Sequence, residues 1–270
     1  MTTTKRPEDW TLAEIERFWA YQASHEHRLR LYFSRLVAPA LRYFLQLHGV
    51  LRGPAVDLGA GPGYFVHELA SQGIDCWAVD SSSASLTHAE RTCAGLARFR
   101  GTALTHNFRA DLPAAAFSLV TCIETIEHLP TDLIPQLIAE ATRLTQPGGY
   151  LLITTPHEEQ LIEGQVLCPF CDTEFHHMQH FQSFTAERLL SLVPSDAFEI
   201  VVCRGVDLSL FEPRDSLLRT LRQRYGVLRG IAKFLQAAVP ICLSREIARR
   251  TELAYRLAPG PHLVLLARRK

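Results

Sequence analysis

Three glycines at alternate positions, Gly59, Gly61 and Gly63, are the first residues in this chain whose spacing indicates chemistry. They follow a short apolar run, 55–58, that also holds Asp57. Glycine takes left-handed backbone conformations and lets a ligand approach the main chain closely. Dinucleotide-binding folds use G-x-G-x-x-G, with the pyrophosphate at a helix N-terminus. The spacing G-x-G-x-G disfavours a nicotinamide oxidoreductase and predicts a strand, a ligand-binding turn and a helix, with a purely structural turn as the alternative.

A second group of reactive side chains lies in a polar, histidine-rich stretch and has the spacing C-x2-C-x4-H-x3-H. Its members are Cys168, Cys171, His176 and His180. Two thiolates and two imidazoles suit a tetrahedral Zn²⁺ ion. We therefore predict a structural zinc site at these four residues, with His177 as a spare ligand. The alternative is a polar lid whose cysteines are free thiols.

Alternating strands and helices must position these residues. We expect strands at 55–58, 74–80, 101–106, 117–123, 150–154, 198–203 and 262–267, and helices at 63–71, 84–97, 185–193 and in a stretch capped by Thr131 or Asp132 and ended by Gln146-Pro147-Gly148-Gly149. Strands and helices of these lengths in alternation favour an α/β fold with right-handed crossovers. We predict a doubly wound, mostly parallel seven-stranded sheet.

The two ends of the chain add helices to this sheet. Residues 8–48 have apolar residues at helical spacing, with a boundary expected at Pro39. We divide the chain into an N-terminal helical cap (1–53), whose aromatic residues we expect in the core, and a main domain (54–270). Two insertions in that domain stand out, the Cys/His-rich residues 157–183 and the basic helical residues 213–256.

The segment Val56-Asp57-Leu58-Gly59-Ala60-Gly61-Pro62-Gly63 resembles motif I of the class I S-adenosylmethionine (SAM)-dependent methyltransferases. The resemblance covers about residues 55–155 closely and the last two strands loosely. It implies a Rossmann-like methyltransferase fold, with the methionine part of SAM against the glycine loop. Asp80 ends the second strand, where a carboxylate can accept both ribose hydroxyls. Its alternative role is to cap the following helix.

Two further segments carry the resemblance. It places Asn107-Phe108 at the adenine, with Asp111 as a competitor, and the stretch 122–129 beside the sulfonium and the substrate. Where the family often has Phe-Asp, this chain has Phe117-Ser118, a departure at a position that usually supports the fold. The cofactor-binding residues that we predict are Asp57, Gly59, Ala60, Gly61, Gly63, Asp80, Ser81, Asn107, Phe108, Ile123 and Glu124.

The stretch after the fourth strand also offers acid–base chemistry. His128 is our candidate general base, because an imidazole titrates near neutrality, although a structural role is equally open. Glu124, Glu127 and His128 lie at i, i+3 and i+4, on one face of a helical turn. They resemble the E-x-x-E-H site with which some ubiquinone-type O-methyltransferases and small-RNA 3′-end 2′-O-methyltransferases hold a divalent cation. In that version a histidine from 176–180 completes the site, in place of zinc.

Composition limits the partners. The 270 residues carry no formal net charge, so no global field attracts nucleic acid. Residues 204–256 hold eleven Lys/Arg against five Asp/Glu, which permits peripheral contact with an anionic surface. The N-terminus has no apolar signal segment, no run of about 18 apolar residues exists, and seven cysteines do not suggest a disulfide framework. We expect a cytoplasmic protein.

The predicted function is a SAM-dependent methyltransferase that methylates an oxygen of a small molecule. N- or C-methylation is not distinguished by these residues. One alternative is an RNA methyltransferase, which would bind with strong salt dependence because phosphate contacts release counterions. The other is a catalytically silent SAM-binding regulatory protein.

Overall fold

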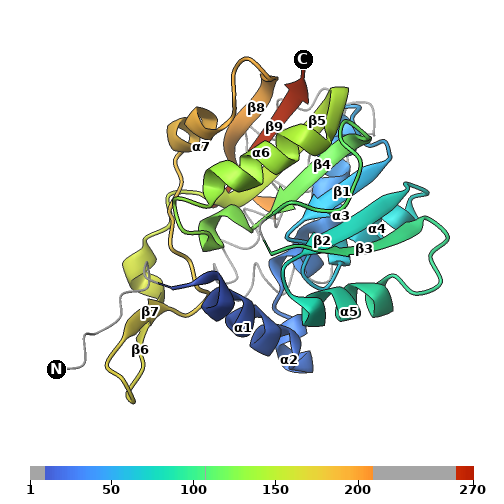
Figure 1. Cartoon of the computed structure of the whole chain (residues 1–270). Helices are drawn as coiled ribbons and strands as arrows, with labels where there is room; N and C mark the ends of the chain where they lie inside the picture. Colours follow the sequence, from blue (N-terminus) through green and yellow to red (C-terminus); the bar gives the residue numbers. More distant parts are fainter. Residues whose placement is uncertain (1–9, 107, 209–259) are drawn as a thin grey trace, which may run out of the picture.

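A computed structural model describes residues 10–106, 108–208 and 260–270, and Figure 1 shows its central sheet. The seven strands lie in the order β3-β2-β1-β4-β5-β9-β8. Strands β1 to β5 pair in parallel, and β9 runs antiparallel between β5 and β8. The bounds are β1 Ala55–Leu58, β2 Cys76–Asp80, β3 Phe99–Leu104, β4 Phe117–Ile123, β5 Thr145–Pro156, β8 Phe198–Val206 and β9 His262–Arg269. The predicted doubly wound, mostly parallel seven-stranded fold is confirmed.

Helices cover both faces of this sheet. One face packs against α3 (Phe33–Leu47), α4 (Tyr64–Ser71) and α5 (Ser83–Thr92), and the other against α6 (Ile134–Leu144) and α7 (Ala186–Leu192). Successive strand residues alternate between the two cores: Ala55 belongs to the first and Val56 to the second. Strand side chains point alternately to the two faces of the sheet. Because helices cover both faces, both sets of side chains are apolar. Strand β4 is therefore buried along its whole length.

Three helices precede β1 among the described residues, and Pro39 is not the boundary that we predicted. It lies inside α3. A proline in a helix interior removes a hydrogen bond and costs about 3 kcal/mol. Packing outweighs that cost, because α3 buries six residues: Val37, Ala38, Ala40, Leu41, Phe44 and Leu45. Helices α1 (Leu12–Ala23) and α2 (Glu26–Leu29) lie below the sheet in Figure 1, beside α5.

Several other boundaries differ from the predictions. Helix α5 ends at Thr92, five residues early, in a turn of non-helical residues. Neither Thr131 nor Asp132 caps α6; its N-cap residue is Leu133, and Pro135 lies in the first turn. Proline suits that turn because its missing N–H would have no partner there. Strand β5 begins at Thr145, so the sheet takes up the residues that we expected to end the helix.

Residues 157–183 form a segment with its own hairpin. It holds a 3₁₀ turn, η3 (Leu161–Gly164), and two short antiparallel strands, β6 (Gln165–Leu167) and β7 (Glu174–His176). Figure 1 shows this hairpin projecting beside the start of α1. The predicted basic helices at 213–256 lie outside the described residues. Among the described helices, none is long and apolar enough to cross a membrane.

Candidate active site

A cavity of about 370 Å³ lies at the carboxyl ends of β1, β2 and β4, where parallel α/β sheets bind their ligands. Its walls come from the glycine loop, the strand ends, the N-terminal helices and the 157–183 segment. The lining includes Leu12, Ile15, Trp19, Arg28, Tyr32, Gly59, Ala60, Gly61, Asp80, Ser81, Thr105, Phe108, Ile123, Glu124, Glu127, His128, Leu129, Met178 and His180. This volume is in the range of small-molecule sites.

The glycine loop forms one wall of this cavity, and its conformation requires glycine. Gly59 and Gly63 both have φ of +77°, in the left-handed region. A Cβ on Gly59 would clash with the Thr125 side chain, and one on Gly63 would lie 2.8 Å from Cβ of Ala89. Gly63 does not line the cavity; it is the N-cap residue of α4, and Ala89 belongs to α5. We interpreted the spacing of the three glycines as a ligand-binding motif. Packing between α4 and α5 explains the glycine at position 63.

Asp80 connects the glycine loop to the next helix. Its Oδ2 accepts the N–H of Gly61 at 2.8 Å, and its Oδ1 accepts the N–H of Ser82 at 2.8 Å. Ser82, not Asp80, is the N-cap residue of α5, since its hydroxyl accepts from Ser85 N–H. The Asp80 carboxylate thus lines the cavity without serving as the cap, and burial raises its pKa.

The other predicted cofactor residues divide into two groups. Phe108, Ile123 and Glu124 line the cavity together with Ala60 and Ser81. Asp57 does not line it: the carboxylate is buried beneath the loop and accepts a hydrogen bond of 2.6 Å from Thr121 Oγ1. Burial raises the pKa of Asp57 to about 7. Asn107 lies outside the described residues.

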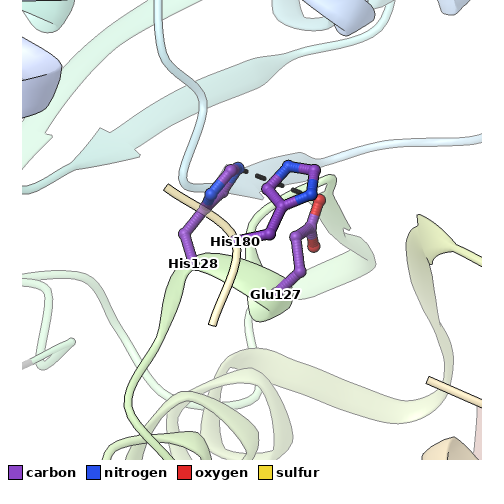
Figure 2. A group of neighbouring side chains, drawn as sticks. All are labelled: Glu127, His128 and His180. Atoms are coloured by element: carbon purple, nitrogen blue, oxygen red, sulfur yellow. Dashed lines mark ion pairs between the residues drawn. The ribbon is translucent and has the colours of Figure 1, made fainter. Parts of the chain in front are cut away.

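The opposite wall holds two histidines and a carboxylate that point toward one another (Figure 2). The potential ligand atoms of Glu127, His128 and His180 all lie within 4.8 Å of one another. Glu127 is fully buried, and neither carboxylate oxygen has a hydrogen-bond partner in the described residues. Nε2 of His128 lies 3.8 Å from Glu127 Oε1. Burying a carboxyl group without a hydrogen-bond partner costs folding free energy, and a ligand bound at these three residues would offset that cost.

Burial disfavours the charged forms of Glu127, Glu124 and His128. It raises the pKa of Glu127 well above its usual range, with the charge of Glu124 adding to the effect. Burial also raises the pKa of Glu124 to about 8. The pKa of His128 moves far below its usual value, first through burial and then through the neighbouring His180. A bound cation would favour the charged carboxylates that burial disfavours.

The ring orientation of His128 follows from one hydrogen bond. Its Nδ1 lies 3.3 Å from the main-chain oxygen of Gln179. A carbonyl oxygen only accepts, so Nδ1 carries the proton and Nε2 keeps its lone pair. That lone pair lies on the side of Glu127. His128 can therefore act as a metal ligand or as a proton acceptor.

The four predicted zinc ligands are not brought together. Gln165 pairs with His176 at the base of the β6–β7 hairpin, whereas Cys168 and Cys171 lie at its tip. Three strand residues separate the two ends, roughly 10 Å, while all ligands of one zinc ion lie about 2.0–2.3 Å from it. Among the described residues, His176 and His180 gather instead with Glu159. The structure therefore does not assemble the four-ligand site.

Residues of the N-terminal helices were missed as site residues. We expected the aromatic residues there in the core, yet Trp19 and Tyr32 line the cavity. Trp19 Nε1 donates to Gln179 Oε1 at 2.7 Å, and Gln179 Nε2 donates to the main-chain oxygen of His128 at 2.8 Å. Ile15, Trp19 and Gln22 share one helix face at i, i+4 and i+7. That mixture of apolar and amide side chains was the available signal.

The fold and the cavity define the class of protein. A parallel sheet with one reversed strand and a glycine loop at its carboxyl edge is the architecture predicted from the class I methyltransferase resemblance. The sequence pattern of the family described as "Methyltransferase domain" matches residues 25–201. The chain belongs to this family, and the predicted resemblance is confirmed.

Individual relatives agree with that assignment. A ubiquinone biosynthesis O-methyltransferase from Methylococcus capsulatus is 34% identical over 157 residues, which are 53% of this chain and 61% of the relative. One from Photorhabdus laumondii is 31% identical, over 57% of this chain and 65% of its own length. The chain thus spans less than two thirds of these curated relatives.

Solved structures share the fold. The DhpI–SAH complex has a TM-score of 0.55 at 16% identity, covering 94% of this chain and 96% of that one. A SAM-dependent methyltransferase from Methanosarcina mazei has a TM-score of 0.52 at 16% identity, covering 83% and 96%. At these identities the likeness is one of fold.

Proposed function

We propose that this protein transfers the methyl group of SAM to a hydroxyl oxygen of a small molecule, with a divalent cation at Glu127, His128 and His180. The observation that carries the proposal is Glu127 in the wall of the cavity, a fully buried carboxyl group whose two oxygens accept no hydrogen bond from any described residue. The names of the relatives, ubiquinone biosynthesis O-methyltransferases, support transfer to oxygen.

The residues of the loop side fit SAM. The backbone of Gly59 to Gly61 leaves room for close approach of the methionine part, and Asp80 offers an acceptor for ribose hydroxyls. Among the described residues, Arg28 is the only arginine or lysine that lines the cavity, and its Nε has no hydrogen-bond partner there. We assign Arg28 to the carboxylate of SAM. Bound SAM supplies an activated methyl group on a sulfonium.

The residues of the opposite wall fit a hard divalent cation such as Mg²⁺ or Mn²⁺. They offer carboxylate oxygens from Glu127, and from Glu124 beside it, whose Oε1 is also buried without a partner. His128 and His180 add imidazole nitrogens, which Mn²⁺ accepts more readily than Mg²⁺ does. When bound, the cation supplies Lewis acidity that lowers the pKa of an acceptor hydroxyl.

The protein itself supplies position and exclusion of water. Methyl transfer from a sulfonium is a displacement, so holding the acceptor oxygen in line and desolvated provides most of the acceleration. Leu12, Ile15, Trp19, Leu129 and Met178 line the cavity around the histidines, and the edge-to-face rings of Trp19 and His128 lie 4.6 Å apart. This wall suits an acceptor with an apolar, ring-like body. If turnover needs no cation, Nε2 of His128 is the proton acceptor.

The test is a turnover assay with radiolabelled SAM, an extract of small molecules and purified protein treated with EDTA. We expect labelled product only after Mn²⁺ or Mg²⁺ is restored, with mass spectrometry locating the methyl group on oxygen. Full turnover in EDTA would remove the cation from the proposal. Binding of SAH, the demethylated product of SAM, without any turnover would favour the silent regulatory protein. Labelled RNA would favour the nucleic acid alternative.

A further inference from the structure

Glu159 lies between two imidazole rings of the 157–183 segment. Its Oε2 is 2.6 Å from Nδ1 of His180, and its Oε1 is 3.5 Å from Nε2 of His176. The two rings stack at 4.5 Å with an angle of 17° between their planes. His176 is only 5% exposed. One carboxylate therefore faces one nitrogen of each of two histidines.

The main chain determines which nitrogen of His176 carries a proton. Nδ1 of His176 accepts the N–H groups of Met178 and His180, each at 3.3 Å. A ring nitrogen that accepts hydrogen bonds has no proton, so Nε2 of this ring is protonated. That nitrogen faces Glu159 Oε1. Glu159 is thus oriented by a histidine whose tautomer the backbone fixes.

Glu159 offers His180 an acceptor. A carboxylate has no proton to donate, so across the 2.6 Å contact Nδ1 of His180 donates to Oε2 of Glu159. A ring that donates from Nδ1 keeps its lone pair at Nε2.

We propose that Glu159 and His176 are positioning residues that hold His180 as its Nδ1–H tautomer, so that its unprotonated Nε2 can bind a cation together with Glu127 and His128. This inference rests on the proposed function and deepens it. Carboxylates that accept from a metal-binding histidine commonly fix its orientation and raise its basicity. The β6–β7 hairpin then has a role in the site, because its last residue, His176, orients the carboxylate.

The same residues permit a competing interpretation, a second cation held by Glu159, His176 and His180. The hydrogen bonds argue against it. Nε2 of His176 and Nδ1 of His180 both carry protons on the side that faces Glu159, so neither offers a lone pair there. One cation per chain follows from the proposal, and two follow from the competing interpretation.

Mn²⁺ binding measured by electron paramagnetic resonance and calorimetry tests the proposal. We expect one Mn²⁺ per wild-type chain and an affinity about 10–100-fold weaker in Glu159→Ala. Glu159→Gln and His176→Gln should lose less, since an amide can still accept from or donate to the neighbouring group. Glu158→Gln is the matched control, because Glu158 is exposed and adjacent. An unchanged affinity in Glu159→Ala, or a second Mn²⁺ lost only in that variant, would overturn the proposal.

The tautomer is tested in metal-free protein by long-range ¹H–¹⁵N spectra of the histidine rings. Wild type should show His180 protonated at Nδ1, and Glu159→Ala should populate the Nε2–H form while SAH affinity stays unchanged. If wild type binds no Mn²⁺, the cation of the proposed function fails, yet this measurement still decides the role of Glu159. His180 keeping its Nδ1 proton in Glu159→Ala would contradict that role.

Discussion

The two walls of the cavity satisfy their polar groups in opposite ways. On the loop side, Asp80 already accepts the N–H groups of Gly61 and Ser82, so the carboxylate is held in place before any ligand binds. On the opposite side, neither carboxylate oxygen of Glu127 has a hydrogen-bond partner in the part of the chain that the structure describes. A group satisfied by its own backbone is preorganised, whereas an orphaned buried group stores a cost that a ligand can remove. The first wall is complete without its ligand and the second is not.

The largest expected effect comes from removing the charge of the incomplete wall. Glu127→Gln keeps the shape of the side chain but should lower turnover about 10²–10⁴-fold, because the acceptor hydroxyl loses its activation. The affinity for SAH, measured by calorimetry, should not change. Glu163→Gln, an exposed change in the 157–183 segment, serves as control. Equal losses of turnover and SAH affinity would mean that Glu127 also contributes to cofactor binding, so that the two walls do not function independently.

A change in the loop wall should have the reverse signature. Asp80→Asn replaces a charged acceptor with a neutral one and should weaken SAH binding about 10–100-fold, because hydrogen bonds to charged groups contribute about 1.5–3 kcal/mol. Turnover at saturating SAM should change little. Asp75→Asn is the control, since Asp75 forms an exposed ion pair with Arg100. An SAH affinity that Asp80→Asn leaves untouched would remove Asp80 from the cofactor site.

Two glycines at opposite ends of α4 separate conformational strain from packing. Gly63 and Gly73 have similar positive φ values, +77° and +83°, but only Gly63 has a neighbour within 3 Å of an added Cβ. Gly73→Ala should cost about 1–2 kcal/mol of unfolding free energy through backbone strain. Gly63→Ala should cost about 1–3 kcal/mol more, through its clash with Ala89. Urea unfolding measures both, and equal losses would show that packing at Gly63 is unimportant.

The smallest effect is a dependence of stability on pH. The pKa of Glu127 is raised in the folded protein, so the folded state keeps a proton that the unfolded state has lost above about pH 4.3. Metal-free stability should therefore fall as pH rises, by up to about 1.4 kcal/mol per pH unit for this group. The window for the measurement is about pH 7.5 to 8.5, where unfolded histidines, with a pKa of about 6.5, are largely neutral and add little. Glu127→Gln should show a shallower slope in urea unfolding, and a parallel slope would mean that Glu127 titrates normally.

The fold was predictable because its signals are local. Strand β4 was predicted with its observed ends, since seven consecutive residues are buried on both faces. Boundaries failed where packing overrides local preference. Pro39 remains helical because six residues of α3 are buried against the core. Helix α6 begins at Ile134 without a side-chain cap because its apolar face packs against the sheet. Neither outcome is visible in the residues at the boundary.

The two walls were not equally predictable. The loop wall comes from a short stretch and the next strand end, so spacing was sufficient to place Gly59, Gly61 and Asp80. The opposite wall joins Trp19, Glu127 and His180, which lie far apart in the chain. The zinc prediction failed because spacing does not report that the hairpin sends His176 to its base and Cys171 to its tip. The E-x-x-E-H pattern predicted one helical turn for Glu124, Glu127 and His128. Glu127 and His128 lie on the 3₁₀ turn η2 (Ile126–His128), whereas Glu124 precedes this turn with a left-handed φ of +46°.

The tip of the β6–β7 hairpin has a practical consequence. Phe170 and Cys171 are exposed there, whereas the base of the segment is fastened by main-chain hydrogen bonds from Phe181 and Gln182 to Glu127. Hydrogen bonding from Thr173 lowers the pKa of the Cys171 thiol, and Cys76, Cys93 and Cys122 are buried. Of the described cysteines, Cys171 should therefore react preferentially with a thiol-reactive fluorophore. Such a label would report, in real time and without disturbing either wall, how the segment responds when substrates enter and products leave.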